Sequence, residues 1–238
     1  MSLPDSAQPV AAWLAARAHP HAPRLLDASA RTAQEAADAL GVSLGQIAKS
    51  IVFRRQPDDA AVMVVTSGDQ RVDEKKLAAL VCAQGHKLGR ADPDFVRART
   101  GFAIGGVSPV AQASAVVLVL DVSLFRYAQV WAAAGHPHAV FQATPAQLAW
   151  LTQARIDDVA SAGLSADARA QALLRARAAC MQDERAGDPP SPCISVCRMD
   201  ESSGLCSGCL RSLDEIASWS SLSPLGRRGV WGAIAARA

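Results

Sequence analysis

Four cysteines near the end of the chain have the spacing of a metal site. Cys193, Cys197, Cys206 and Cys209 follow the pattern C-x3-C-x8-C-x2-C, and the 238-residue chain contains only two other cysteines. Two closely spaced pairs let one short loop deliver four thiolates, which are ligands for Zn²⁺ or an iron-sulfur cluster. Disulfides are the alternative, but they need an oxidising compartment, and no secretory signal pattern opens the sequence. We therefore expect reduced thiols, a cytoplasmic protein and a site for zinc or an iron-sulfur cluster.

A second candidate for chemistry is Lys49, which lies in the apolar sequence Ile47-Ala48-Lys49-Ser50-Ile51-Val52-Phe53. A lysine at the start of a buried strand can bind a phosphate or stabilise a developing negative charge. A lysine whose ammonium group reaches solvent is the alternative, and from the residues alone it is favoured.

A third candidate is the glycine-rich segment from Gly101 to Pro109. Adjacent Gly105 and Gly106, followed by Val107-Ser108-Pro109, predict a tight loop that can aim backbone amides at a ligand. An ordinary turn between two elements is the alternative, and from the glycines alone it is favoured. Signatures of familiar hydrolases and nucleotide-binding loops are absent from the sequence.

The elements that position these residues are predicted to form an α+β domain. Helices are expected at 6–18, 32–40, 73–80, 92–101 and after Thr144, with a further short helix starting at Ser43. Strands are expected at 50–53 and 61–65, joined as a hairpin, and at 116–120, 139–141 and 156–159. We expect a mixed or antiparallel sheet, or a barrel-like core, surrounded by helices.

The chain is predicted to divide into three parts. The α+β domain covers residues 1–162, a helical connector with a proline-rich linker covers 163–190, and the four-cysteine domain covers 191–238. The last part is too short to build a sufficient core alone, so a metal should stabilise it. A capping box at Ser212–Glu215 and the Ser223-Pro224 pair predict two short helices there.

Composition excludes two classes of partner. The formal net charge is only +2, which argues against an extensive DNA-binding surface and leaves room for a local contact with nucleic acid. The longest apolar run, around residues 113–120, is far below the roughly 20 residues of a membrane span, so no membrane segment is expected.

Together, the Lys49 segment and the glycine loop resemble the YbaK/aminoacyl-tRNA deacylase family, whose members are related to the editing domain of prolyl-tRNA synthetases. The resemblance spans roughly residues 5–160. Further matches lie at residues 33–37, 67–76 and 87–92. Around residues 131–141, alanines precede Gly135 where some cysteinyl-tRNA editing members carry a serine-glycine element, so amino-acid specificity cannot be transferred.

This resemblance implies hydrolysis of the ester of a mischarged tRNA by a trans-acting deacylase. Lys49 matches the essential lysine of the family and is the expected catalytic residue. The residues expected to bind substrate are Ser50, Gly105, Gly106, Val107, Ser108, Pro109, Gly135 and His138. No cofactor is implied for deacylation. The expected partners are the acceptor end of mischarged tRNA and an aminoacyl-tRNA synthetase. The acceptor end would contact a local basic patch of this protein, formed by Arg71, Lys75, Lys76, Lys87 and Arg90.

The four-cysteine segment resembles a separate small bacterial domain, generally predicted to be an iron-sulfur protein, for which no activity is established. This leaves an alternative function open. The first domain could be a non-catalytic tRNA- or protein-binding module, coupled to an iron-sulfur or zinc domain that acts as a sensor or a docking element.

Overall fold

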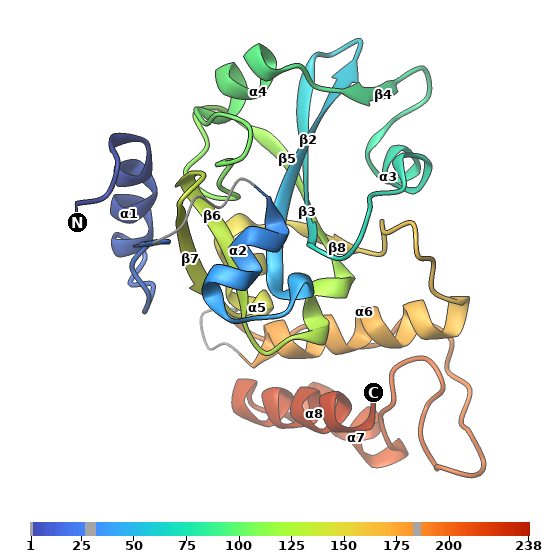
Figure 1. Cartoon of the computed structure of the whole chain (residues 1–238). Coiled ribbons are helices and arrows are strands. Elements are labelled where there is room, and N and C mark those ends of the chain that lie inside the picture. Colours follow the sequence, from blue (N-terminus) through green and yellow to red (C-terminus); the bar gives the residue numbers. More distant parts are fainter. Residues whose placement is uncertain (1, 27–31, 183–186) are drawn as a thin grey trace. The chain divides into compact units, whose positions relative to one another are not determined.

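The computed structural model describes residues 2–26, 32–182 and 187–238, and it divides the chain into two compact units, Met1–Gly163 and Leu164–Ala238 (Figure 1). The elements of the first unit are η1 (Asp5–Ala7), α1 (Gln8–Ala15), β1 (Arg24–Leu25), α2 (Ala33–Leu40), η2 (Leu44–Gln46), β2 (Ile47–Gln56), β3 (Ala60–Ser67), α3 (Glu74–Val81), β4 (Lys87–Arg90), α4 (Pro93–Thr100), β5 (Val116–Asp121), η3 (Val122–Arg126), β6 (Val130–His136), β7 (Ala139–Ala143), α5 (Pro145–Thr152) and β8 (Arg155–Asp157). The second unit contains α6 (Ala166–Met181), α7 (Leu213–Ser218), η5 (Trp219–Ser221) and α8 (Pro224–Arg237).

The first unit is built on one mixed sheet of eight strands. Seven strands follow the order β1-β7-β6-β2-β3-β5-β8, and β4 pairs with β2 outside this path. The β2–β3, β2–β4, β6–β7 and β1–β7 pairs are antiparallel, whereas β2–β6, β3–β5 and β5–β8 are parallel. The predicted α+β class with a mixed sheet and surrounding helices is confirmed.

The predicted hairpin is the centre of this sheet, where β2 and β3 run side by side (Figure 1). Between its two partners, β3 is buried from Ala61 to Ser67, which explains its continuous run of β-branched and apolar residues. Phe53, Val62, Val64 and Leu77 belong to one apolar cluster that joins the hairpin to α3.

The second partner of β2 changes along the strand. Strand β6 pairs only with Ile47 and Ala48, and β4 pairs only with residues 53–56. The edge of β2 that faces away from β3 is therefore unpaired by either strand from Lys49 to Val52. In an antiparallel ladder, alternate residues direct their backbone groups to opposite sides, so two of these four residues present an N–H and a C=O to this open edge.

Helix boundaries follow the capping signals in the sequence. The side chains of Thr32, Asp73, Asp92 and Thr144 each accept a hydrogen bond from the first turn of a helix, as their types predict. Strand β6 was not predicted, because its Ala132-Ala133-Ala134-Gly135 run lacks the β-branched residues typical of strands. Its burial between β7 and β2 decides its conformation.

The second unit combines α6 with the four-cysteine segment. Its core contains Leu174 of α6 together with Val230, Trp231 and Ile234 of α8, and Trp231 Nε1 donates a hydrogen bond to the Pro190 carbonyl at 3.0 Å. The capping box of Ser212 and Glu215 starts α7 as predicted. Helix α8, with 14 residues, is longer than the short helix expected there. Residues 183–186 of the expected linker lie outside the described residues.

Among the described helices, none combines the length and the apolar character needed to cross a membrane.

Candidate functional site

A cavity of about 690 Å³ lies against the open edge of β2. All residues from Ile47 to Phe53 line it, together with residues from α2, the segment between β3 and α3, β4, α4, the glycine loop, β6 and β7. Ligand cavities for small molecules have volumes of this order. Because the edge of β2 is unpaired at this place, residues of both faces of the strand line the cavity.

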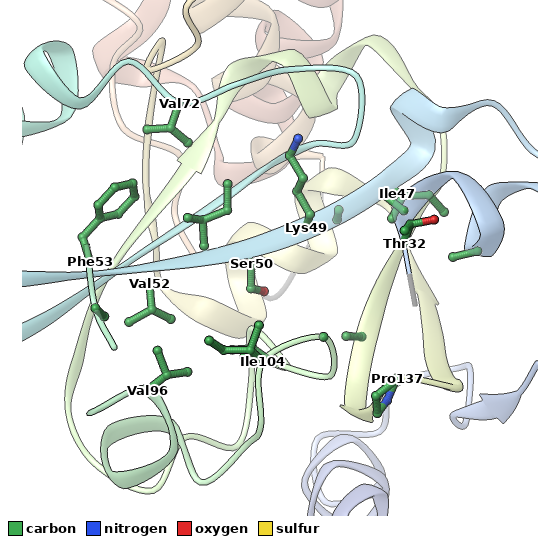
Figure 2. Close-up of a pocket in the computed structure, with 18 of the residues that line it drawn as sticks. Thr32, Ile47, Lys49, Ser50, Val52, Phe53, Val72, Val96, Ile104 and Pro137 are labelled. Carbon is green, nitrogen blue, oxygen red and sulfur yellow. The ribbon is translucent and has the colours of Figure 1, made fainter. Parts of the chain in front are cut away.

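Lys49 and Ser50 point to opposite faces of β2, as neighbours on a strand must (Figure 2). Lys49 Nζ donates a hydrogen bond to the Gly68 carbonyl at 3.1 Å and a second bond to the Gln70 carbonyl. An ammonium group has three donors, so one N–H of Lys49 has no acceptor among the described residues. Burial lowers the pKa of Lys49, Asp69 opposes this effect and Arg71 adds to it.

Ser50 lies on the same face of β2 as Ile104 of the glycine loop (Figure 2). Its Oγ atom is buried and has no hydrogen-bond partner within the described parts of the chain. A buried hydroxyl group without a partner costs free energy, so such a group inside a cavity is a candidate for binding a polar atom of a ligand.

The glycine loop begins with a tight turn. The Gly106 amide donates to the Ala103 carbonyl at 3.0 Å, and Gly105 has a φ of +94°, the arrangement of a type II turn. The Gly106 amide is thus used inside the turn. The amides of Gly105 and Val107, both of which line the cavity, have no acceptor in the described segments.

Close packing fixes this loop against the end of β6. A Cβ atom on Gly106 would lie 2.8–2.9 Å from the backbone of His136, so only glycine fits there. Gly135, with a φ of +86°, is equally constrained, because a Cβ atom would lie 2.2 Å from the Ser6 carbonyl oxygen. Both glycines shape the site without lining its cavity.

The remaining residues expected at the site lie behind or beside the cavity. Ser108 and Pro109 are buried, and Ser108 Oγ accepts a hydrogen bond from the Val110 amide at 3.3 Å. His138 lies in the turn between β6 and β7, where its amide donates to His136 Nδ1 at 3.2 Å. Pro137, between these histidines, is the residue of this turn that lines the cavity.

The residues of the expected basic patch differ in their surroundings. Arg71 and Arg90 line the cavity, as does Glu74, whose carboxylate lies 3.8 Å from the Arg90 guanidinium. Lys76, by contrast, donates to Asp158 at 3.0 Å and to the Ala160 carbonyl at 2.9 Å. Lys76 therefore ties α3 to the segment after β8. Sequence reasoning missed Glu74, whose position directly after the Asp73 cap gave no sign that it lines a cavity.

The four cysteines share one irregular segment of the second unit. Cys193 and Cys197 are exposed, whereas Cys206 and Cys209 are buried. The Ser195 amide donates to Cys193 Sγ, and Arg211 Nε donates to Cys209 Sγ, each at 3.4 Å. Within the described ranges, no group of three or more His, Cys, Asp or Glu side chains is arranged to hold a metal ion. The metal site stays a prediction from spacing and donor type.

Comparison with protein families gives one match for each unit. The model of the aminoacyl-tRNA editing domain matches residues 27–151, which include β2, the glycine loop and all the residues that line the cavity. A family described as a protein of unknown function, DUF1289, matches residues 191–238.

Individual relatives match the first unit. The uncharacterized protein YwhH of Bacillus subtilis (strain 168) is 37% identical over 122 residues, 51% of this chain and 75% of that protein. The proline--tRNA ligase of Kosmotoga olearia is also 37% identical, over 91 residues, 38% of this chain but only 15% of the ligase. The crystal structure of a proposed trans-editing enzyme for prolyl tRNA synthetase is 43% identical, with a TM-score of 0.62, and the match covers 67% of this chain and 99% of that one.

Proposed function

Because the chain belongs to the aminoacyl-tRNA editing domain family, we propose that its first unit is a trans-acting deacylase that hydrolyses the ester of mischarged tRNA. The observation that carries this proposal is the cavity at the open edge of β2, with Lys49 on one face of the strand and the glycine loop on the other. The similarity to a proposed trans-editing enzyme for prolyl tRNA synthetase supports the same reaction.

The two faces of β2 would bind different parts of the substrate. Two carbonyl groups hold the Lys49 ammonium on the side of the β3–α3 segment, where its remaining N–H can bind the phosphate or the sugar of the terminal nucleotide. The aminoacyl ester would then lie across the open edge, near the amides of Gly105 and Val107. Ser50 Oγ would bind a polar atom of the aminoacyl group.

In the proposed reaction, the oxygen of a water molecule bonds to the ester carbonyl carbon, and the carbonyl oxygen becomes an oxyanion. The amides of Gly105 and Val107 would stabilise this charge, because fixed backbone donors need no reorganisation as the charge develops. The bond to the ribose oxygen then breaks, and that oxygen takes a proton. The products are a free amino acid and a tRNA with a free terminal hydroxyl group.

The proton of the attacking water needs an acceptor. Among the described residues that line the cavity, Glu74 is the one carboxylate, it is paired with Arg90, and no histidine is present. We propose that the neighbouring hydroxyl group of the terminal ribose accepts this proton while its own proton passes to the leaving ribose oxygen. This accounts for a site that contains a lysine and backbone amides in place of a catalytic triad.

Replacing Lys49 tests the proposal. Lys49→Met should lower kcat/KM for deacylation of a mischarged tRNA about a hundredfold, the cost of one well-placed charged donor. The assay is release of the labelled amino acid, run across a panel of mischarged tRNAs. Circular dichroism should show an unchanged fold. Wild-type protein that binds these tRNAs but hydrolyses none of them would support the binding-module alternative, and undiminished activity of Lys49→Met would remove the lysine from the mechanism.

For the second unit we propose a structural metal site. Cys193, Cys197, Cys206 and Cys209 are the donors, and N–H groups directed at two of the sulfur atoms fit thiolate ligands. Zinc or an iron-sulfur cluster bound there would stabilise the unit, because metal binding and folding are coupled in small domains. Deacylation needs no contribution from this metal.

A further inference from the structure

Arg126, the last residue of η3, joins several groups around the turn that follows β3. Its Nη2 atom donates to Asp69 Oδ1 at 2.8 Å, to Asp69 Oδ2 at 3.0 Å and to Ser67 Oγ at 3.1 Å. Its Nε atom donates to the Ser123 carbonyl at 2.9 Å. The guanidinium group is therefore fixed by its own helical turn on one side and by the β3–α3 segment on the other.

The turn that Arg126 contacts is itself closely fitted. The Gln70 amide donates to the Ser67 carbonyl at 3.0 Å, so residues 67–70 form a hydrogen-bonded turn. Ser67 is fully buried, and its Oγ donates to the Gly45 carbonyl. A Cβ atom on Gly68 would lie 2.3 Å from the Leu44 carbonyl oxygen, so this position requires glycine.

The same turn holds Lys49. The two carbonyl groups that accept hydrogen bonds from its ammonium belong to Gly68 and Gln70, the residues on either side of Asp69. Any change in the position of Asp69 would therefore move both acceptors of Lys49.

We propose that Arg126 is a positioning residue for Lys49: it holds Asp69 and Ser67, and so fixes the turn whose carbonyl groups orient the lysine ammonium at the cavity. The importance of this for catalysis rests on the proposed function. The positioning itself is measurable without any substrate.

The charges around Lys49 give this role an electrostatic signature. Burial lowers the pKa of Lys49, Asp69 raises it and Arg71, on the same segment, lowers it. Burial raises the pKa of Asp69, but the interactions of Asp69 with Ser67 and Arg126 outweigh this effect, and the pKa lies below its ordinary value. Arg126 thus balances the carboxylate that raises the pKa of Lys49. Glu74 of α3 and Arg90 of β4 also line the cavity, and they pair with each other.

Two substitutions should move the titration of Lys49 in opposite directions. Arg126→Gln leaves the Asp69 carboxylate unbalanced, which favours the charged lysine, so the pKa of Lys49 should rise. Asp69→Asn removes the attraction, so this pKa should fall further. The chain has only four lysines, so NMR of protein with ¹³C-labelled lysine can follow each of them, with the Lys49 signal assigned from Lys49→Met.

Arg99→Gln is the matched control. It removes the ion pair with Asp59, in which the side chains of Arg99 and Asp59 are 39% and 40% exposed. The side chains of Arg126 and Asp69 are 46% and 32% exposed, so the two pairs are similar, but the control pair makes no contact with the turn. The control should leave the titration of Lys49 unchanged. Arg126→Lys keeps the positive charge but lacks the planar guanidinium group. It should therefore restore the pKa of Lys49 more fully than it restores the geometry of the turn.

Kinetics supply the second readout. Arg126→Gln should lower kcat/KM for deacylation by up to about a hundredfold, the cost of a small displacement of the Lys49 ammonium. The fall of kcat/KM at high pH should move to higher pH, together with the pKa of Lys49. An unchanged titration of Lys49 in Arg126→Gln would overturn the proposal, whatever the result for Asp69→Asn. If the wild-type protein deacylates nothing, the proposed function fails, while the titration still decides whether Arg126 positions Lys49.

Discussion

Ser50 is the residue where function and stability should oppose each other. Its buried Oγ has no partner among the described residues, so Ser50→Ala removes an unsatisfied group and should raise the free energy of unfolding by about 1 kcal/mol. The same change should raise KM for the mischarged tRNA roughly fivefold, because one hydrogen bond to the aminoacyl group is lost. Urea denaturation and steady-state deacylation measure the two effects.

Thr66 provides the control for Ser50. Its Oγ1 atom is also buried without a partner in the described chain, but Thr66 does not line the cavity. Thr66→Val should stabilise the protein to a similar extent and leave KM unchanged. A Ser50→Ala variant that behaves like Thr66→Val in both measurements would remove Ser50 from substrate binding.

Individual site residues differ in how far the sequence could reveal them. Lys49 and Gly105 were identified by their motifs, and both line the cavity. The roles of Arg126 and Glu74 could not be read, because each depends on a partner brought close by the fold, Asp69 in one case and Arg90 in the other. Lys76, expected in the basic patch, forms an ion pair with the buried carboxylate of Asp158, a partner that the sequence did not reveal.

At the scale of elements, the glycine loop depends on its contact with β6. Gly106→Ala would place a Cβ atom 2.8 Å from the His136 backbone, so the loop must move. We expect a loss of about 2 kcal/mol in the free energy of unfolding and a large fall in kcat/KM, because the free amides of Gly105 and Val107 would be displaced. Denaturant unfolding and deacylation kinetics on the same preparation provide the measurement.

Gly89, on β4, is the corresponding control. A Cβ atom there would meet nothing within 4 Å, and its backbone conformation suits any residue. Gly89→Ala should preserve both stability and activity. Wild-type activity in Gly106→Ala would show that the geometry of the loop does not matter for the reaction.

Elements with strong local signals were predictable, and those determined by distant partners were not. The β2–β3 hairpin and the capped helices follow from β-branched runs and N-cap residues. Strand β6 consists largely of alanine and glycine and forms because β7 and β2 pair with it. The open edge of β2 could not be foreseen, since it depends on where β4 and β6, far apart in the sequence, stop pairing.

For the whole molecule, we expect the first unit to work alone. A protein of residues 1–163 should deacylate mischarged tRNA with the kcat/KM of the full chain, because every residue that lines the cavity belongs to this unit. Solved structures similar to this chain cover about two thirds of it and nearly all of their own length, which supports independent folding. A truncated protein that folds but is inactive would assign the second unit a part in the reaction.

The second unit should depend on the proposed metal. A strong chelator, or Cys206→Ser, should abolish the thermal unfolding transition of residues 164–238 and leave deacylation unchanged. Metal analysis and the visible absorption spectrum of anaerobically purified protein identify the occupant: a coloured protein indicates an iron-sulfur cluster, and a colourless one with bound zinc indicates zinc. Purified protein without either metal that retains both unfolding transitions would refute the proposed site.

The gap in the pairing of β2 also bears on how the molecule avoids aggregation. A strand with exposed backbone groups is normally a template on which another chain can add a strand. Here the exposed stretch is only four residues long, and β6 and β4 close it at both ends. An incoming strand longer than this stretch would find the next positions of β2 already paired. The protein can thus keep unpaired backbone donors and acceptors open to a compact ligand while disfavouring their pairing with a second polypeptide.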